Sequence, residues 1–396
     1  NLHQISRIMK ALVFQRMTDI YGDVPYSQAG LGYYERIYTP VYDKQQDIYT
    51  DLLKEVSEAV DSLDEDADKP IVDLFYSGNP STQIDEWKKF GNSFLLRIAM
   101  RLSKVDPATA QQYVQKVQGL TMTNNDDNAL VQHNAGNFQN RDAIEINGQD
   151  SADLKLCSTF IDTLKSNNDP RLPDIAWIYA KMDSKPEDQL GLPPGYIVGG
   201  LDPAYDITKH PELGYYDSLG IYDSLGMQRY SRLNDKILNL TAPNLVLTYA
   251  ETEFLLADAA KRWGIGDAEK HYNNAVLAAI AQFSAYGKDA AISTTDANAY
   301  LAAHPYNDAT ALNQINTQYW ICTLMDEYEA WSNWRRTGYP VLKPTNYPGN
   351  ITGGTIPRRM EYSTVEQFSN AVNYKAAVAR LQGGDELTSR VWWDTK

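Results

Sequence analysis

The residues from Tyr249 to Phe283 predict two helices joined by a tight turn, and this pattern constrains the fold more than any other part of the sequence. Gly264 and Gly266 interrupt the first helix, and Asp267 is a suitable N-cap for the second. The residues that recur at helical spacing on the two sides of the turn are Ala250, Phe254, Ala257, Ala260, Ala268, Tyr272, Ala275 and Ala279. Small side chains let two helices pack closely, so the segment is typical of a tetratricopeptide-like pair of about 34 residues.

Two further helix pairs are expected in the first third of the chain. Apolar residues recur at helical spacing in 5–20 and 48–63, and again in 87–103 and 108–117. Their connections are longer and their periodicity is less regular than in the pair at 249–283. We therefore predict a mainly all-α fold class, made of degenerate tetratricopeptide-like helix pairs with long irregular loops.

Three long irregular segments separate the expected helices, at residues 30–42, 169–243 and 338–356. They combine Pro and Gly with many Tyr, which makes them too aromatic for ordinary disorder. Long loops inside compact domains tend to be functional. We expect a single domain over 1–396, in which a helical scaffold at 1–168 and 244–396 carries an inserted aromatic loop region at 169–243.

The segment 319–340 contains three of the eight Trp of the chain. Its large residues are spaced as on one face of a single helix, which would end at Gly338 because glycine adopts the left-handed C-cap conformation easily. Aromatic rings beside Arg335 and Arg336 are typical of a buried helix in which an arginine stacks on a tryptophan. A ligand site is the alternative interpretation.

Charge and motif content exclude several functions. The net charge of −15 disfavours binding to nucleic acid and to anionic membranes. Cys157 and Cys322 are far apart in sequence, and the five His show no metal-ligand spacing. We expect no cofactor and no metal site, although a structural calcium ion held by loop carboxylates stays open. No nucleophile elbow, phosphate loop or marked carboxylate pair is present, so we expect a protein that is not an enzyme.

Aromatic composition points towards binding. The chain has 27 Tyr and 8 Trp but only 9 Phe. Tyr and Trp combine a flat apolar face with a polar edge, which complements the C–H face and hydroxyl rim of a sugar. The alternative, given equal weight here, is that the tyrosines fill contacts between helices.

Six stretches resemble, in order, motifs of SusD/RagB-type outer-membrane lipoproteins, and especially the SusD-like branch. They are IYGDVPYSQA at 20–29, WKKFGNSFLLRIAMRLS at 87–103, LTYAETEFLLADAAKRWG at 247–264, EAWSNWRRTGYP at 329–340, IPRRMEYS at 356–363 and RVWWD at 390–394. Each stretch is weakly specific by itself. Their common order over nearly the whole chain makes the resemblance strongly specific.

The resemblance implies a non-catalytic protein of the cell surface that captures oligosaccharides and delivers them to a TonB-dependent, SusC-like transporter in the outer membrane. Members of the family carry a signal peptide, a lipid-bearing Cys and a substantial region before the first motif, which here begins at Ile20. We therefore expect that the sequence is a piece of a longer protein. Its membrane attachment would then be a lipid anchor outside this chain.

The candidate ligand-binding residues are tyrosines of the irregular segments together with one arginine that could bond sugar hydroxyls. They are Tyr196, Tyr205, Tyr215, Tyr216, Tyr222, Arg232, Tyr33 and Tyr34. They follow from loop position and side-chain chemistry, not from the family motifs. Packing of the loops against the helices is an equally weighted interpretation for each tyrosine.

Two other functions stay open at this point. Tetratricopeptide-like pairs commonly bind peptides in a concave groove, so a peptide- or protein-binding helical scaffold is the main alternative. A hydrolase with an unrecognised pair of carboxylates is a weaker one.

Overall fold

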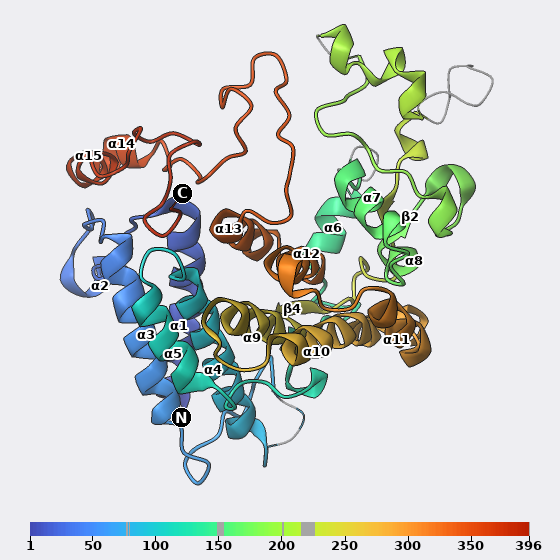
Figure 1. Cartoon of the computed structure of the whole chain (residues 1–396). Coiled ribbons are helices and arrows are strands. Elements are labelled where there is room, and N and C mark those ends of the chain that lie inside the picture. The colour runs from blue at the N-terminus through green and yellow to red at the C-terminus, as the bar shows by residue number, and fades with distance from the viewer. Residues whose placement is uncertain (77, 79, 149–153, 200–201, 215–225, 396) are drawn as a thin grey trace.

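The computed structural model describes residues 1–76, 78, 80–148, 154–199, 202–214 and 226–395. The fold is mainly helical, as predicted (Figure 1). The helices are α1 (Leu2–Tyr21), α2 (Gly32–Glu35), α3 (Gln45–Asp61), α4 (Gln83–Arg101), α5 (Pro107–Val117), α6 (Arg141–Gly148), α7 (Ser158–Ser166), α8 (Leu172–Ile175), α9 (Tyr249–Trp263), α10 (Ala268–Ala281), α11 (Thr294–Ala303), α12 (Ala311–Cys322), α13 (Glu327–Thr337), α14 (Glu366–Ser369) and α15 (Ala371–Val378). The strands are β1 (Ala129–Val131), β2 (Ala176–Trp177), β3 (Arg232–Leu233) and β4 (Asn244–Leu247), which pair antiparallel as β1–β4 and β2–β3.

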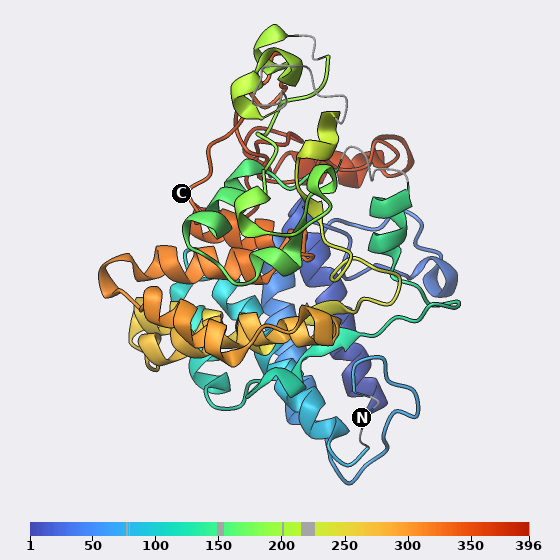
Figure 2. The same cartoon turned by 90° about the vertical axis from the view of Figure 1, so that its right-hand side faces the viewer.

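The helices form two groups that cross steeply. Helices α1, α3, α4 and α5 stand side by side, and α9 to α12 run across them (Figures 1 and 2). Helix α1 packs on α3, α4 packs on α5, and α9 packs on α10, which confirms the three predicted pairs. The main core lies where the two groups meet, and it includes Leu52, Phe94, Phe254 and Tyr319.

The α9–α10 turn follows from its capping residues. Gly264 ends α9 with φ 69°, a left-handed conformation that glycine adopts at little cost. The side chain of Asp267 then accepts a hydrogen bond from the backbone N–H of Lys270 and starts α10. Asp106 caps α5 in the same way by accepting from the N–H of Thr109, and Pro107 occupies the first helical position.

The prediction of one continuous helix through 319–337 is wrong. Helix α12 ends at Cys322, Met325 has φ 75°, and a new helix starts at Glu327. The Asp326 carboxylate accepts from the N–H of Glu329 and caps α13, so the chain turns where the apolar spacing suggested continuity. The predicted end of the helix is correct, since Gly338 has φ 81°.

A buried network of charges joins the two helix groups. On α4, Arg97 binds Glu251 of α9 at 2.6 Å, and Arg101 binds Glu329 of α13 at 2.5 Å. The Tyr319 hydroxyl donates to both carboxylates, at 2.9 and 2.8 Å. Burial opposes the ionised form of Glu329, but Arg101 and Arg97 hold its pKa below the usual range.

The same network reaches the two ends of the described chain. Arg101 also binds Asp19 of α1 at 3.1 Å, and the indole N–H of Trp393 donates to Asp19 at 2.9 Å. The Tyr49 hydroxyl on α3 donates to Asp19 as well. A single carboxylate therefore joins α1, α3, α4 and the C-terminal segment.

A second buried cluster surrounds Arg336 on α13. Its guanidinium binds Asp258 of α9 at 2.9 Å and donates to Asn333 and to the Ser103 hydroxyl. Asp258 also pairs with Arg262 and accepts from Asn316 on α12. Burial opposes ionisation of Asp258, yet Arg336 and Arg262 lower its pKa below the usual value.

The described residues of 154–243, called here the upper lobe, lie above the crossing helices in Figure 1. The lobe has a small core that includes Phe160, Ile161 and Leu172, and this core packs on Phe283 and Ile321 of the helical scaffold. A smaller cluster around Ile207 and Tyr230 supports its outer part. The segment 169–243 is therefore anchored together with α7, which precedes it.

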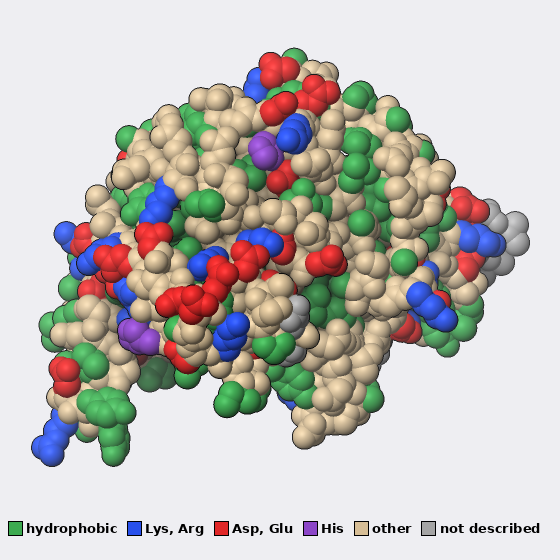
Figure 3. All heavy atoms as spheres, turned by 90° about the horizontal axis from the view of Figure 1, so that it is seen from below, with side chains coloured by type: hydrophobic (Ala, Val, Ile, Leu, Met, Phe, Trp, Pro, Cys, Tyr) green, Lys and Arg blue, Asp and Glu red, His purple; other side chains and the backbone are tan. Residues whose placement is uncertain are grey.

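The surface is acidic, in keeping with the net charge of −15. Seen from below, carboxylates form a band across the molecule, with Lys and Arg beside them (Figure 3). Within the described ranges, none of the helices combines the length and the apolar character that crossing a membrane requires. Cys322 is buried and Cys157 is half-buried, and neither forms a disulfide.

The Arg336 cluster predicts a pH-dependent contribution to stability. Because the pKa of Asp258 is lower in the folded protein than in the unfolded chain, the Asp258 carboxylate stabilises the fold fully above the ordinary carboxyl pKa of about 4. This stabilisation is lost as the pH falls through the lower pKa of the folded protein. Asp258→Asn should cost about 3–5 kcal/mol at pH 7, because the buried Arg336 guanidinium and the half-buried Arg262 guanidinium lose their counter-ion. Urea unfolding at several pH values measures both effects.

The matched control is Glu145→Gln, which breaks the exposed pair of Arg141 and Glu145. An exposed pair of this kind should contribute less than about 1 kcal/mol. Between pH 5 and 3, the Asp258→Asn variant should lose less unfolding free energy than the wild type. Parallel pH profiles for the two would contradict a charged, stabilising Asp258.

Candidate functional site

The segment that follows α13 connects the scaffold with the upper lobe. Residues 339–356, called here the strap, rise from the end of α13 and return towards the scaffold (Figure 1). The strap is fastened at its far end, where the Thr345 hydroxyl donates to the carbonyl of Pro194 at 3.2 Å. Gly195 is required at this contact, since a Cβ there would lie 2.4 Å from a Thr345 methyl and its φ is 91°.

The strap and the upper lobe together build a cluster of tyrosines. Tyr205 lies between Tyr196 and Tyr347, with ring centroids 5.5 and 5.0 Å apart. The Tyr205 hydroxyl donates to the carbonyl of Asn346 at 3.1 Å. All three rings are half-buried, so part of each remains open to solvent. They provide fixed apolar faces with polar edges, a combination suited to a sugar.

A histidine adjoins this tyrosine cluster. The His210 ring lies edge-on to Tyr196 at 5.3 Å, and its Nδ1 is 2.8 Å from a Glu212 carboxylate oxygen. The hydrogen bond with Glu212 raises the pKa of His210. This pair holds the imidazole in place beside the ring.

A pocket of about 670 Å³ lies at the base of the strap, between α7, α12 and α13. We call it the tryptophan pocket, because its wall includes Trp320, Trp331 and Trp334. Phe160 and Leu156 of the upper lobe also line the pocket, and Leu342 and Ile356 belong to the two ends of the strap. The pocket is therefore open, apolar and strongly aromatic.

Contacts behind the rings hold the pocket wall rigid. The Trp331 indole N–H donates to the carbonyl of Pro357 at 3.0 Å, and the Arg335 guanidinium stacks on the Trp331 ring at 3.8 Å. Trp320 packs edge-on against Phe160 at 5.1 Å. Rings that are already fixed lose little entropy when a ligand binds.

The wall of the tryptophan pocket has few charges. Of its described lining residues, Glu327 is the single carboxylate. Glycoside hydrolysis usually requires two carboxyl groups that flank the scissile bond. The pocket therefore has the composition of a binding site and lacks that catalytic pair.

The structure separates the predicted ligand residues. Tyr196 and Tyr205 meet in the tyrosine cluster, whereas Tyr33 and Tyr34 lie on α2, on another part of the molecule (Figures 1 and 2). Arg232 binds Asp235 at 2.8 Å and stacks on Trp177 at 4.7 Å, so its charge is already neutralised. Tyr215, Tyr216 and Tyr222 fall outside the described residues.

Sequence reasoning did not place the tryptophans in a site. For 319–340 the sequence allowed two interpretations, a buried helix and a ligand site. The structure has features of both. The inward face of α13 buries Glu329, Arg335 and Arg336, as a core helix does. The three Trp remain half-buried along the pocket. Their concentration in one short segment was the available signal.

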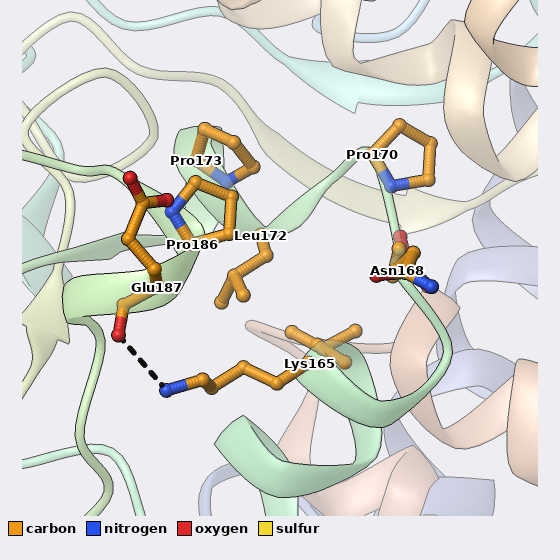
Figure 4. Close-up of a pocket in the computed structure, with 9 residues that line it drawn as sticks. Lys165, Asn168, Pro170, Leu172, Pro173, Pro186 and Glu187 are labelled. Carbon is orange, nitrogen blue, oxygen red and sulfur yellow. Dashed lines mark hydrogen bonds between the residues drawn. The ribbon is translucent and has the colours of Figure 1, made fainter.

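A second pocket of the upper lobe, of about 420 Å³, is lined by three proline rings (Figure 4). Pro173 and Pro186 lie beside Leu172 on one side, and Pro170 lies on the other. The Lys165 ammonium donates to the carbonyls of Glu187 and Gln189, at 3.3 and 2.7 Å. Because the Lys165 ammonium already donates to backbone carbonyls, it is less available to bind a ligand. This pocket is therefore a weaker candidate than the tryptophan pocket.

Metal binding has no support in the part of the chain that the structure describes. There, His, Cys, Asp and Glu side chains form no group of three that could hold a metal ion. In the acidic loop 64–68, the carbonyl oxygens of Asp64 and Asp68 accept hydrogen bonds from the Asn1 side-chain amide, at 2.6 and 2.7 Å. The idea of calcium elsewhere stays a prediction.

Comparison with known proteins identifies the family. Residues 1–363 match the model of a SusD-like family described as starch-binding and associating with the outer membrane. None of the curated proteins compared with the chain matches it.

Solved structures agree in fold. One, described as a chitin-binding protein, has 35% identity and a TM-score of 0.83, and the match covers 99% of this chain and 81% of that one. A Bacteroidetes SusD-like protein has 27% identity and a TM-score of 0.81, over 100% and 84% of the two chains. A chitin-binding SusD homologue from Flavobacterium johnsoniae has 25% identity and a TM-score of 0.78, over 99% and 80%.

The family is described as starch-binding, and two of these relatives are described as chitin-binding. Members of the SusD-like family bind carbohydrate and are not enzymes, which confirms the expectation of a non-catalytic protein. The crossing helix pairs, the strap and the aromatic pocket all occur within the matched residues. The chain therefore belongs to the SusD-like family of starch-binding proteins that associate with the outer membrane.

Proposed function

We propose that this protein binds oligosaccharides of the chitin type in the tryptophan pocket, without transforming them. The observation that carries the proposal is the open pocket of about 670 Å³, whose wall presents three indole rings. Each ring is held by a packing contact, Trp320 by Phe160, Trp331 by Arg335 and Trp334 by Arg358. The family provides the carbohydrate class. The choice of chitin is supported by the two relatives described as chitin-binding.

Pocket chemistry favours a neutral ligand with apolar faces. Each pyranose ring of a chitin oligosaccharide presents C–H groups that can lie against an indole, and its acetamido methyl group can enter the apolar wall formed with Phe160 and Leu156. Starch has no acetamido group to fill this wall. The tyrosine cluster at the far end of the strap would contact the next sugars along the chain.

We expect modest affinity for a single oligosaccharide, on the order of micromolar to millimolar. The rings are preorganised, which favours binding, but few polar groups of the wall can bond sugar hydroxyls. Such affinity suits a protein that must release its ligand.

We further propose that the ligand passes to a TonB-dependent, SusC-like transporter, and that a lipid anchor holds the protein on the extracellular face of the outer membrane. Association of the family with the outer membrane supports the location. An uptake partner is the natural destination for a ligand that the protein binds and leaves intact.

Trp334→Ala tests the pocket. Removing one indole face should weaken binding of a chitin hexasaccharide about tenfold, because roughly 1–2 kcal/mol of apolar contact is lost. Trp334→Phe, which keeps an aromatic ring, should recover part of this loss. Titration calorimetry measures the affinity, and thermal unfolding shows whether each variant is folded.

Trp263→Ala is the matched control, since Trp263 is also half-buried but packs against the main core at the end of α9. It should lower stability and leave sugar affinity unchanged. Equal affinity of the wild type and the folded Trp334→Ala variant would remove the tryptophan pocket from the proposal.

Ligand class is tested with oligosaccharides of equal length from chitin and from starch. The acetamido-bearing series should bind at least about fivefold more tightly, because one buried methyl group contributes roughly 0.8 kcal/mol and more than one sugar is held. Tighter binding of the starch series would keep the carbohydrate function and refute the chitin assignment. Binding of peptides but of neither series would refute both.

The partner is tested by affinity purification of the tagged full-length protein from outer membranes. A TonB-dependent barrel should co-purify in near-equal amount, and Trp334→Ala should leave this association intact, because that substitution acts on the sugar site. Recovery of the protein without any barrel would contradict the transporter proposal.

A further inference from the structure

The short segment around α2 carries three tyrosines whose side chains are almost fully exposed to solvent. The exposed fractions of Tyr33, Tyr34 and Tyr38 are 88, 82 and 76%. Tyr33 and Tyr34 stand edge-to-face with centroids 5.1 Å apart, which forms an aromatic corner open to solvent. Phe368 on the neighbouring α14 is exposed to a similar degree, at 84%.

The backbone that carries these rings is firmly attached to the scaffold. The side-chain amides of Asn370 and Asn373 donate to the carbonyls of Pro40 and Thr39, at 2.8 and 3.0 Å. The Tyr42 hydroxyl donates to Glu366 at 2.8 Å. The N–H of Val41 donates to Gln28 at 3.0 Å. The three rings therefore lie on a segment that is anchored before any ligand binds. Binding would not incur the entropic cost of ordering a flexible loop.

The hydroxyl groups distinguish these tyrosines from their neighbours. The hydroxyls of Tyr26 and Tyr42 are used inside the protein, where they donate to Asp51 and Glu366. Those of Tyr33, Tyr34 and Tyr38 have no hydrogen-bond partner among the described residues. Both the ring faces and the polar edges are free to contact an external molecule.

Charge and chemistry select a neutral, hydroxyl-rich ligand. The charged residues within this corner, Glu35 and Arg36, are adjacent and of opposite sign. A purely apolar partner would leave three phenol hydroxyls unpaired at the contact, which costs free energy. A sugar chain offers C–H faces to the rings and hydroxyls to their edges.

We propose that Tyr33, Tyr34 and Tyr38 form a second carbohydrate-contact surface, separate from the tryptophan pocket, which engages another stretch of polysaccharide. This inference rests on the proposed function. Figures 1 and 2 place α2 away from the upper lobe and the strap, so one short oligosaccharide bound at the pocket does not involve α2. A polymer or an insoluble particle contacts both surfaces.

Two weak contacts on one ligand raise the overall affinity, because the second contact becomes intramolecular. Binding to insoluble chitin should therefore exceed binding to the hexasaccharide by at least about tenfold, and the excess should depend on the tyrosines. The tyrosines are exposed, so their loss should not alter the fold.

The test compares wild type, Tyr33→Ala/Tyr34→Ala and Tyr33→Ala/Tyr34→Ala/Tyr38→Ala on two probes, a chitin hexasaccharide and insoluble chitin. The control is Ile71→Ser/Val72→Ser, which removes equally exposed apolar side chains from another loop. The tyrosine variants should keep hexasaccharide affinity and lose at least about tenfold in retention on insoluble chitin. The control should match the wild type on both probes.

Other outcomes overturn the inference in recognisable ways. Unchanged retention of the tyrosine variants on chitin would remove the second surface while leaving the tryptophan pocket intact. An equal loss on both probes would make these tyrosines part of a single site. Normal retention together with loss of the co-purified barrel would make the surface a protein contact. A wild type that binds neither probe would refute the proposed function and this inference together.

Discussion

Two arginines of α4 hold the scaffold together from inside. Arg97 and Arg101 are both buried, and each is paired with a carboxylate from another helix. Transferring a charge from water into the protein interior costs free energy unless an opposite charge is well placed beside it. These ion pairs therefore tolerate little change in the angle at which the helices cross. Tyr319 bridges the two carboxylates, and Asp19 extends the network to α1 and the C-terminal segment. The site depends on this arrangement, because α12 and α13 carry the three tryptophans.

The network explains why the fold could be predicted from sequence. The motif at 87–103 contains Arg97 and Arg101, the motif at 247–264 contains Glu251 and Asp258, and the motif at 329–340 contains Glu329 and Arg336. Residues that reveal the family are therefore the ones that pair inside the core. They identify the scaffold and say nothing about the ligand. The break at Met325 was missed because apolar spacing continues through it, while Asp326 caps a new helix.

The binding surfaces were only partly predictable, because they depend on segments that meet in space. The irregular loop predicts ligand contacts for Tyr196 and Tyr205, but the third ring of the cluster, Tyr347, reaches them from the strap, far along the sequence. Arg232 looked available and is neutralised by Asp235, three residues away. The sequence favoured a core position for Trp331 and Trp334, because aromatic rings beside Arg335 and Arg336 are typical of a buried helix. The structure shows that a helix can bury its charged face and display its indoles at a pocket.

The central claim is that fixed indole rings at the base of the strap receive a neutral sugar chain. A crystal structure of the protein with a bound chitin hexasaccharide tests it most directly. The account predicts electron density for sugar rings in contact with Trp320, Trp331 or Trp334, with the buried arginine network unchanged. An oligosaccharide bound elsewhere, with the tryptophan pocket filled only by solvent, would contradict it.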